Sequence, residues 1–372
     1  MSLTDHHIDD TGLIPYLEHR ANIDDNARVA ALVRQQSDPE KGWPRLIKNL
    51  ETYRRLEKKV VTVSGVDIAV TLNETRAPSV TAKTFENAKS GRKPQCFLCH
   101  LDSEQRGLLT LDNRYIILVN PGITIPGDLT IASAQHDPQI VRDSFGDMLI
   151  LSRKLTDYSI FFNGAMAGAS SPHFHFQAGL KSTLIAERQI ERLLNKNPKP
   201  AHLVTIFKNQ SSQICFVDHF LRAMYLLISR DDGEIKRFFE IFYKVLQNVD
   251  QAIRNIPNIP DFGSIITSLE INEYEPRMNL MLKFDPSSGQ YLLAIFPKIF
   301  NRPQAYFRRG DEQILVGMAI KESLGNLISC RRSDYQKLYQ QPHLIEEIYR
   351  DTSITRKMVD DLNAQLMAAF SL

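Results

Sequence analysis

The spacing of hydrophobic residues predicts helical and strand regions that alternate along the chain. Between residues 11 and 58, apolar positions recur at helical spacing, with Leu46, Ile47 and Leu50 as one example. Residues 60–73, VVTVSGVDIAVTLN, alternate instead between apolar and polar, and they carry a central Ser-Gly. That pattern predicts a β-hairpin directly after an N-terminal helical segment.

The middle of the chain predicts short strands around one amphipathic helix. YIILVNP (115–121) and DLTIAS (128–133) are apolar runs separated by the turn-rich GITIPG, which is typical of buried strands. Residues 138–157 place their apolar side chains on one side of a helix. YSIFFNG (158–164) and HFHFQAGL (173–180) then predict two further strands, joined by a turn of small residues.

The rest of the chain predicts helices, a strand pair and closing helices. The pattern is helical from about 183 to 256, RMNLMLKF (277–284) and YLLAIFPKIF (291–300) predict an antiparallel pair, and 334–370 predicts helices again. This order indicates an α+β protein with two sheet-bearing halves. The expected parts are an N-terminal helical segment at 1–60, a first half at 61–185 and a C-terminal half at 186–372.

Composition narrows the class of protein. The 372 residues include 45 basic and 43 acidic side chains, which gives no support for nucleic acid as a partner. No apolar run approaches the roughly 20 residues that span a bilayer, and MSLTDHHIDD lacks the features of a secretory signal. Four cysteines in a chain of this length do not form a disulfide framework, so the cytoplasm is the expected location. Cys215 and Cys330 stand alone and are expected to be ordinary buried residues.

One cysteine pair has the spacing of a metal site. Cys96 and Cys99 form a C-x-x-C in which two thiolates can hold one ion from a tight turn. His100, His136 and His173 are the candidates for the two further ligands that zinc needs. The alternative is a pair of buried or merely reducible cysteines. A redox pair is less favoured, because no βαβ pattern places the motif at a helix start.

A second cluster of candidate residues lies on the predicted strand 173–180. In a strand, residues two apart point the same way, so His173, His175 and Gln177 would share one face. Phe174 and Phe176 would then pack into the core on the other face. The simpler explanation is a strand with a polar face that meets solvent.

The turn before this strand favours a catalytic explanation. NGAMAGASS, at 163–171, concentrates small residues, and Gly164 and Gly168 allow backbone conformations that other residues avoid. Such a turn can bind phosphate oxygens through its backbone N–H groups. A neutral imidazole beside a bound phosphate is a plausible nucleophile on phosphorus. The turn and the glutamine together predict phosphoryl chemistry at this strand.

These motifs resemble those of a known superfamily. FFNGAMAGASSPHFHFQAGL resembles the signature of the histidine-triad superfamily, in its transferase branch of galactose-1-phosphate uridylyltransferases, diadenosine tetraphosphate phosphorylases and GDP-hexose phosphorylases. That branch has H-x-H-x-Q where the hydrolases usually end in a third histidine. CFLC and VNPGITIPGDLTIASAQH follow the superfamily's order, so the resemblance covers about 70–180. It is weaker in FPKIFNRPQAYF and AIKESLGNLISCRRSDYQKL, which contains Glu322 and Gly325.

The resemblance implies a fold and an activity. The fold would be two histidine-triad-like halves, each an antiparallel sheet with packed helices, the second half degenerate. His175 would take the nucleotidyl group, and Gln177 would hydrogen-bond its phosphoryl oxygen. The substrates would be a nucleoside diphosphate sugar or a dinucleotide, with a sugar 1-phosphate or inorganic phosphate as acceptor. The alternatives are a nucleotide hydrolase and a zinc-stiffened nucleotide-binding protein without turnover.

The resemblance also implies a metal site and a substrate pocket. Cys96, Cys99, His136 and His173 would hold a structural zinc ion. The residues expected around ribose and phosphates are Asn73, Arg76, Asn120, Asn163, Gly168, Ser170, Ser171, Lys298 and Arg302. Arg308 and Arg309 are further candidates for a second phosphate, although ordinary surface charge is the favoured explanation. Gly127-Asp128 departs from relatives that have a histidine there, and a homodimer is the expected assembly.

Overall fold

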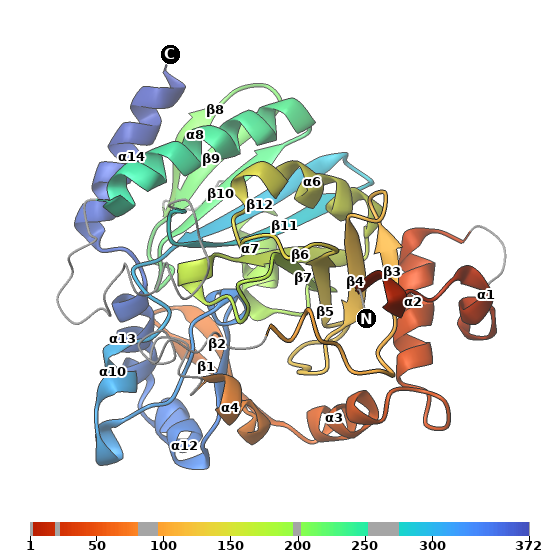
Figure 1. The fold of residues 1–372 in the computed structure, drawn as a ribbon. Helices are drawn as coiled ribbons and strands as arrows, with labels where there is room; N and C mark the ends of the chain where they lie inside the picture. The colour runs from red at the N-terminus through yellow and green to blue at the C-terminus, as the bar shows by residue number, and fades with distance from the viewer. Residues whose placement is uncertain (1–2, 19–22, 81–95, 196–201, 252–274, 372) are drawn as a thin grey trace.

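The computed structural model describes residues 3–18, 23–80, 96–195, 202–251 and 275–371 (Figure 1). Within these ranges, ten strands form one antiparallel sheet that runs through the molecule. In spatial order the strands are β3 (Gly107–Thr110), β4 (Tyr115–Val119), β5 (Leu129–Ser133), β7 (His175–Leu180), β6 (Tyr158–Asn163), β11 (Met278–Asp285), β12 (Gln290–Pro297), β10 (Met224–Ser229), β9 (Ser212–Val217) and β8 (Leu203–Lys208).

The sheet is built from two halves with the same topology. Each half contributes three strands, a helix and two more strands, and the helices are α6 (Phe145–Lys154) and α8 (Asp232–Gln251). The halves join where β6 pairs with β11. This arrangement confirms the two-half α+β fold, although the two expected sheets are one continuous sheet.

The second half lacks the candidate catalytic side chains. β12 takes the place of β7 in the second half, because each is the last strand of its half and pairs with the strand before it. From Tyr291 to Pro297, β12 reads YLLAIFP and contains neither histidine nor glutamine. The second half is therefore degenerate, as expected.

Each face of the sheet carries its own hydrophobic core. Phe162, Phe174 and Phe176 belong to the core beneath α2 (Asp25–Gln36), α6, α8 and α14 (Arg356–Phe370), which confirms the expected packing of the two strand phenylalanines. Phe161 belongs to the opposite core, which lies against a small second sheet and α7 (Ile185–Asn195), α12 (Arg332–Gln340) and α13 (Pro342–Thr352).

The small sheet joins a segment near the start of the chain to one in its C-terminal part. β1 (Glu57–Val63) and β2 (Val66–Leu72) form the predicted hairpin, and β13 (Asn326–Ser329) pairs in parallel with β2. The remaining helical segments are η1 (Leu3–His6), α1 (Asp10–Leu13), η2 (Ile14–Tyr16), α3 (Pro44–Arg54), η3 (Glu74–Arg76), α4 (Ala77–Val80), η4 (Arg142–Ser144), η5 (Ala165–Ala167), α10 (Gln304–Phe307), η6 (Gly310–Glu312) and α11 (Ile320–Ser323).

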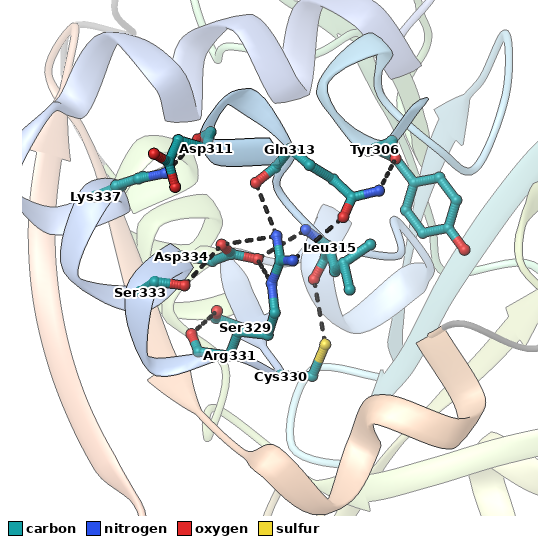
Figure 2. A network of polar contacts seen from close by, with 10 residues as sticks. All are labelled: Tyr306, Asp311, Gln313, Leu315, Ser329, Cys330, Arg331, Ser333, Asp334 and Lys337. Carbon is teal, nitrogen blue, oxygen red and sulfur yellow. Dashed lines mark hydrogen bonds and ion pairs between the residues drawn. The ribbon is translucent and has the colours of Figure 1, made fainter. Parts of the chain in front are cut away.

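A partly buried ion pair lies just after the C-terminal end of β13. Figure 2 shows Arg331 between Asp334 of α12 and the chain at Gln313, with its Nε 2.8 Å from the Asp334 carboxylate. The same carboxylate accepts the backbone N–H of Leu315 at 2.9 Å. These bonds fix the position of segment 313–315, and the residues after it lead into α11.

Two helix predictions are wrong. The region from about 183 to 256 is not continuously helical, because β8, β9 and β10 lie between α7 and α8. All residues of β10, MYLLIS, are buried, and a continuous apolar run does not show the alternation that identifies a strand. The helix expected at 138–157 forms only over α6, since Pro138 makes a bridge with His173. In the described ranges, no helix combines the length and apolar composition that crossing a bilayer requires.

Candidate active site and metal centre

A pocket of about 330 Å³ lies where β6 and β7 diverge. Its walls come from β4, β5, β6 and β7, the cysteine turn, the 120–124 turn and the segment that enters α11. The predicted residues that line it are Arg76, Asn120, Asn163, Gly168, Ser170, His175 and Gln177. The structure thus brings residues from three distant parts of the chain into one cavity.

His175 has the protonation state that a nucleophile needs. Its Nδ1 lies 2.8 Å from the His173 carbonyl oxygen, and a carbonyl only accepts, so Nδ1 carries the proton and donates it. Nε2 is left with its lone pair. The side chain is 2% exposed, and this burial lowers the pKa of the imidazole to about 4. The ring is therefore neutral at pH 7.

Gln139 holds the two strand ends that carry the site. Its Nε2 donates to the carbonyl oxygens of Asn163 and His175 at 3.0 Å each, and its Oε1 accepts the His175 N–H at 2.8 Å. β6 and β7 no longer pair with each other here, so the buried amide replaces a missing strand partner. Sequence reasoning missed Gln139, because nothing in HDPQI distinguishes it from a surface residue.

Gln177 presents its amide nitrogen to the pocket. Its Oε1 accepts from Asn163 Nδ2 at 3.4 Å, and Asn163 Oδ1 accepts the backbone N–H of Ile320 at 2.7 Å. With its oxygen engaged, the group that Gln177 offers a ligand is a hydrogen-bond donor. A donor at this position suits a phosphoryl oxygen.

The small-residue turn requires glycine at one position. Gly168 has φ 116° and ψ 14°, a conformation that side chains disfavour. A Cβ there would also lie 3.0 Å from the Cβ of Ala319, which packs against the turn just before α11. The backbone of the turn therefore approaches both the pocket and the C-terminal segment.

A buried carboxyl group supports this turn from behind. Glu275 Oε1 accepts the Val141 N–H at 2.6 Å, and its Oε2 lies beside Gly164. Glu275 is 2% exposed, and burial raises the pKa of its carboxyl group to about 8. Glu275 is thus a neutral acid over most of the physiological range.

Glu275→Gln is expected to change how stability depends on pH. The folded pKa lies above the unfolded value, so the folded state binds more protons between about pH 4.5 and 8, and its stability falls as pH rises through that window. The slope from one such group is at most about 1.4 kcal/mol per pH unit. Urea unfolding at several pH values should show this slope in the wild type and in exposed Glu312→Gln, but not in Glu275→Gln. An equal slope in all three would contradict this assignment.

A buried ion pair joins α11 to the turn between β4 and β5. Lys321 Nζ lies 2.7 Å from both carboxylate oxygens of Asp128 and 2.9 Å from Thr124 Oγ1. The Asp128 side chain is fully buried and also accepts from Asn120 Nδ2 at 3.1 Å. Asp128 belongs to the Gly127-Asp128 pair that replaces the histidine of the relatives, and its negative charge is balanced by Lys321.

Lys321→Met is expected to destabilise the fold by about 3–5 kcal/mol, because it leaves the Asp128 carboxylate buried without a counter-ion. Adding Asp128→Asn should recover part of that loss. The control is Lys283→Met, since Lys283 pairs with the half-exposed Glu191 and should cost about 1 kcal/mol or less. Chemical unfolding of the four proteins measures these differences, and equal losses for Lys321→Met and Lys283→Met would contradict the expectation.

Four metal-ligand side chains converge beside the pocket. The ligand atoms of Cys96, Cys99, His136 and His173 all lie within 4.8 Å of one another. Cys99 Sγ is 3.0 Å from His136 Nδ1 and 3.3 Å from His173 Nδ1. Two thiols and two imidazole nitrogens at this separation match the edges of a tetrahedral zinc site.

Hydrogen bonds around the cluster orient its ligand atoms and favour the binding of a cation. His173 Nε2 is 2.8 Å from the Ser133 carbonyl, so it donates there and turns the Nδ1 lone pair toward the sulfurs. Burial acts to raise the pKa of the Cys96 thiol, but the side-chain interactions of Cys96 with His173 and Ser171 outweigh burial and lower the pKa to about 6. A thiol that is easily ionised favours metal binding.

Comparison with known proteins identifies one matching family model and several solved structures with a similar fold. Residues 32–180 match the family model of a domain of unknown function, DUF4922, and no curated protein sequence matches the chain. Yeast Ap4A phosphorylase Apa2 in complex with AMP is 13% identical, with a TM-score of 0.52 over 89% of this chain and 97% of that one. A second structure of this yeast enzyme is 13% identical, with a TM-score of 0.51 over 83% and 93%. Its complex with Ap4A is 12% identical, with a TM-score of 0.48 over 83% and 96%.

The chain has the same overall fold as the yeast Ap4A phosphorylase Apa2. This confirms at the level of the fold the resemblance that the motifs carried. Within this fold, the four predicted zinc ligands lie together, and His100 lines the pocket instead of joining them. His173 precedes the first residue of β7, so only His175 and Gln177 of the expected line lie within that strand.

The remaining predicted residues are not among those that line the pocket. Asn73 Oδ1 accepts from Thr75, and Ser171 lies against Cys96. Lys298 is buried near Glu322 and Arg222, and burial lowers its pKa to about 7. Arg302 donates to the Val80 carbonyl at 3.0 Å. Arg308 and Arg309 are exposed.

Proposed function

We propose that this protein is a nucleotidyltransferase that works through a covalent nucleotidyl group on His175. The observation that carries the proposal is the Nδ1–H···O=C bond from His175 to His173, at 2.8 Å, in a ring that lines the pocket beside Gln177. This bond leaves Nε2 as the nucleophile of a neutral imidazole. No stronger base is needed to activate it.

The reaction would proceed in two displacements. In the first, the Nε2 lone pair forms a bond to the α-phosphorus, and the bond from phosphorus to the distal oxygen breaks with its electron pair leaving on that oxygen. In the second, an oxygen of the acceptor attacks the same phosphorus and the N–P bond breaks, which restores the neutral ring. The His173 carbonyl stabilises the positive charge of the loaded ring, and the Gln177 amide donates to the phosphoryl oxygen.

The proposed substrates are a nucleoside diphosphate sugar or a dinucleotide, with a sugar 1-phosphate or inorganic phosphate as acceptor. The similar yeast structures support nucleotide substrates, because one of them holds AMP in the same fold. A neutral amide at Gln177 favours transfer over hydrolysis, since it offers no imidazole to activate water. A homodimer stays a prediction from the resemblance.

We further propose that Cys96, Cys99, His136 and His173 hold a structural zinc ion. All four positions would be filled by protein, which is typical of a structural site and not of a catalytic one. The cysteine turn also forms a wall of the pocket through Phe97, Leu98 and His100. Metal binding would therefore stabilise the wall against which the substrate rests.

Trapping of the intermediate tests the proposal. The purified protein is incubated with α-labelled UDP-, GDP- and ADP-sugars and with dinucleotides, without acceptor, and its intact mass is measured. We expect one nucleoside monophosphate per chain, released on addition of phosphate or a sugar 1-phosphate. Absence of an adduct across the panel would defeat the proposal. A large excess of hydrolysis over transfer would favour a hydrolase, and tight binding without turnover would favour a binding protein.

A further inference from the structure

We infer that the pocket selects guanine as the base of its nucleotide. This inference rests on the proposed function, because it places the α-phosphate of a nucleotide at His175. It concerns the opposite end of the same cavity, where the cysteine turn and the residues after it form the wall.

The sheet geometry sets the distance between the two ends. Gln177 pairs with Thr130 of β5, and Thr130 pairs with Leu118 of β4; all three residues line the pocket. Adjacent strands lie about 4.8 Å apart, so Leu118 is about 10 Å from Gln177 across the sheet. A nucleotide whose phosphate lies at His175 would extend its base over Leu118.

This end of the pocket suits a flat aromatic ring. Leu98, Leu101, Leu118 and Pro121 give it an apolar lining. Phe97 is 52% exposed although its neighbour Leu98 is 2% exposed, so an aromatic face stands free at the rim. Stacking on a purine or pyrimidine would cover that face.

Two hydrogen-bond acceptors stand at the edge of this site, on one turn. The backbone N–H of Gln105 donates to the Asp102 carbonyl at 3.0 Å, which closes the turn and places both side chains at the pocket. Gln105 Nε2 donates to the Val119 carbonyl at 3.2 Å, so Oε1 is the free end of the amide. Gln105 is 5% exposed, and Oε1 accepts no hydrogen bond from the described residues. Oε1 is therefore available to a hydrogen-bond donor on a ligand in the pocket.

Asp102 presents a second acceptor and a neighbouring donor. One of its carboxylate oxygens is 3.1 Å from Arg45 Nη1, and Arg45 also lines the pocket. The other oxygen is free to accept a bond from a ligand. Together the three side chains offer guanidinium donors, a carboxylate acceptor and an amide acceptor.

Only guanine among the common bases satisfies this set. Its O6 accepts, and its N1–H and N2–H₂ are adjacent donors for two acceptors. Adenine and cytosine each have one donor group on this edge, the exocyclic amine, and uracil has one, at N3, so any of the three would leave Gln105 Oε1 unpaired. The expected substrates are therefore guanine nucleotides.

Binding of four mononucleotides to the full-length protein tests the inference. We expect GMP to bind at least about tenfold more tightly than AMP or UMP. IMP, which differs from GMP only by the missing 2-amino group, should bind about three- to tenfold more weakly than GMP, the loss of one hydrogen bond. Isothermal titration calorimetry measures all four dissociation constants.

Asp102→Asn supplies the matched variant. It replaces an acceptor by a group that also donates, so we expect GMP binding to weaken about tenfold while AMP binding changes little. Glu104→Gln removes a charge from the exposed neighbour in the same turn and should leave GMP binding unchanged. AMP or UMP binding as tight as that of GMP, or a variant that keeps the preference, would overturn the inference while the adduct on His175 still forms. Failure of all four nucleotides to bind, with no adduct, would instead defeat the proposed function and the inference with it.

Discussion

His175→Ala is expected to eliminate the covalent adduct and to lower kcat at least about 10³-fold. The imidazole supplies the only bond to phosphorus in the proposed first step, and the Gln177 amide cannot replace it because an amide nitrogen is not nucleophilic. Single-turnover assays with α-labelled nucleotide measure the loss. Binding of the nucleotide should change much less than turnover, because the rest of the pocket lining is retained.

The control for His175→Ala is a substitution of a histidine that lies outside the pocket. His343 is exposed at the start of α13, so His343→Ala should keep full adduct formation and turnover. Circular dichroism and thermal melting of both variants separate chemical loss from unfolding. An adduct of unchanged yield in folded His175→Ala would show that another side chain is the nucleophile.

Cys99→Ser is expected to remove a bound zinc ion and to destabilise the protein by about 4 kcal/mol or more, since loss of a structural metal is among the most destabilising changes. Cys99 is the thiol that lies near both histidines of the cluster, at 3.0 and 3.3 Å. Elemental analysis of the purified protein should give one zinc per chain in the wild type and none in the variant. Chelator treatment of the wild type should lower its melting temperature to that of the variant.

Cys330, which is buried, provides the control for this change. It contacts the Leu315 carbonyl (Figure 2) and does not belong to the cluster, so Cys330→Ser should retain the metal. Because Phe97 and Leu98 stand between the two ligand cysteines, metal loss should also weaken nucleotide binding. Wild-type protein that is purified without metal and melts independently of chelator would show that the four residues are a reduced cluster without an ion.

The sequence predicted those parts of the fold whose signal is local. The hairpin at 60–73 and the strand pair at 277–284 and 291–300 follow from alternation and a short turn, and the structure contains both. The strands β8 to β10 were missed, because the buried run of β10 has no polar positions to mark its period. The parallel pairing of β13 with β2 joins segments that nothing local connects.

The same limit applies to the candidate site. His175 and Gln177 were predicted from one short motif, whereas Lys321 and Asp128 are 193 residues apart and no local pattern pairs them. Lys298 and Arg302 were predicted from their charge, which the sequence shows, but their positions outside the pocket lining depend on tertiary packing, which the sequence does not show. Residue type predicts the chemistry of a side chain, whereas tertiary packing determines whether that side chain lies in the pocket.

The bond between Asn163 and Ile320 has a consequence for protein synthesis. These residues lie 157 positions apart, so a ribosome completes the strand that carries His175 long before it makes the wall that faces it. A chain still attached to the ribosome at that stage lacks the residues of α11 and β13 that line the pocket. If His175 has the role proposed above, its pocket is complete only after translation has delivered these two elements.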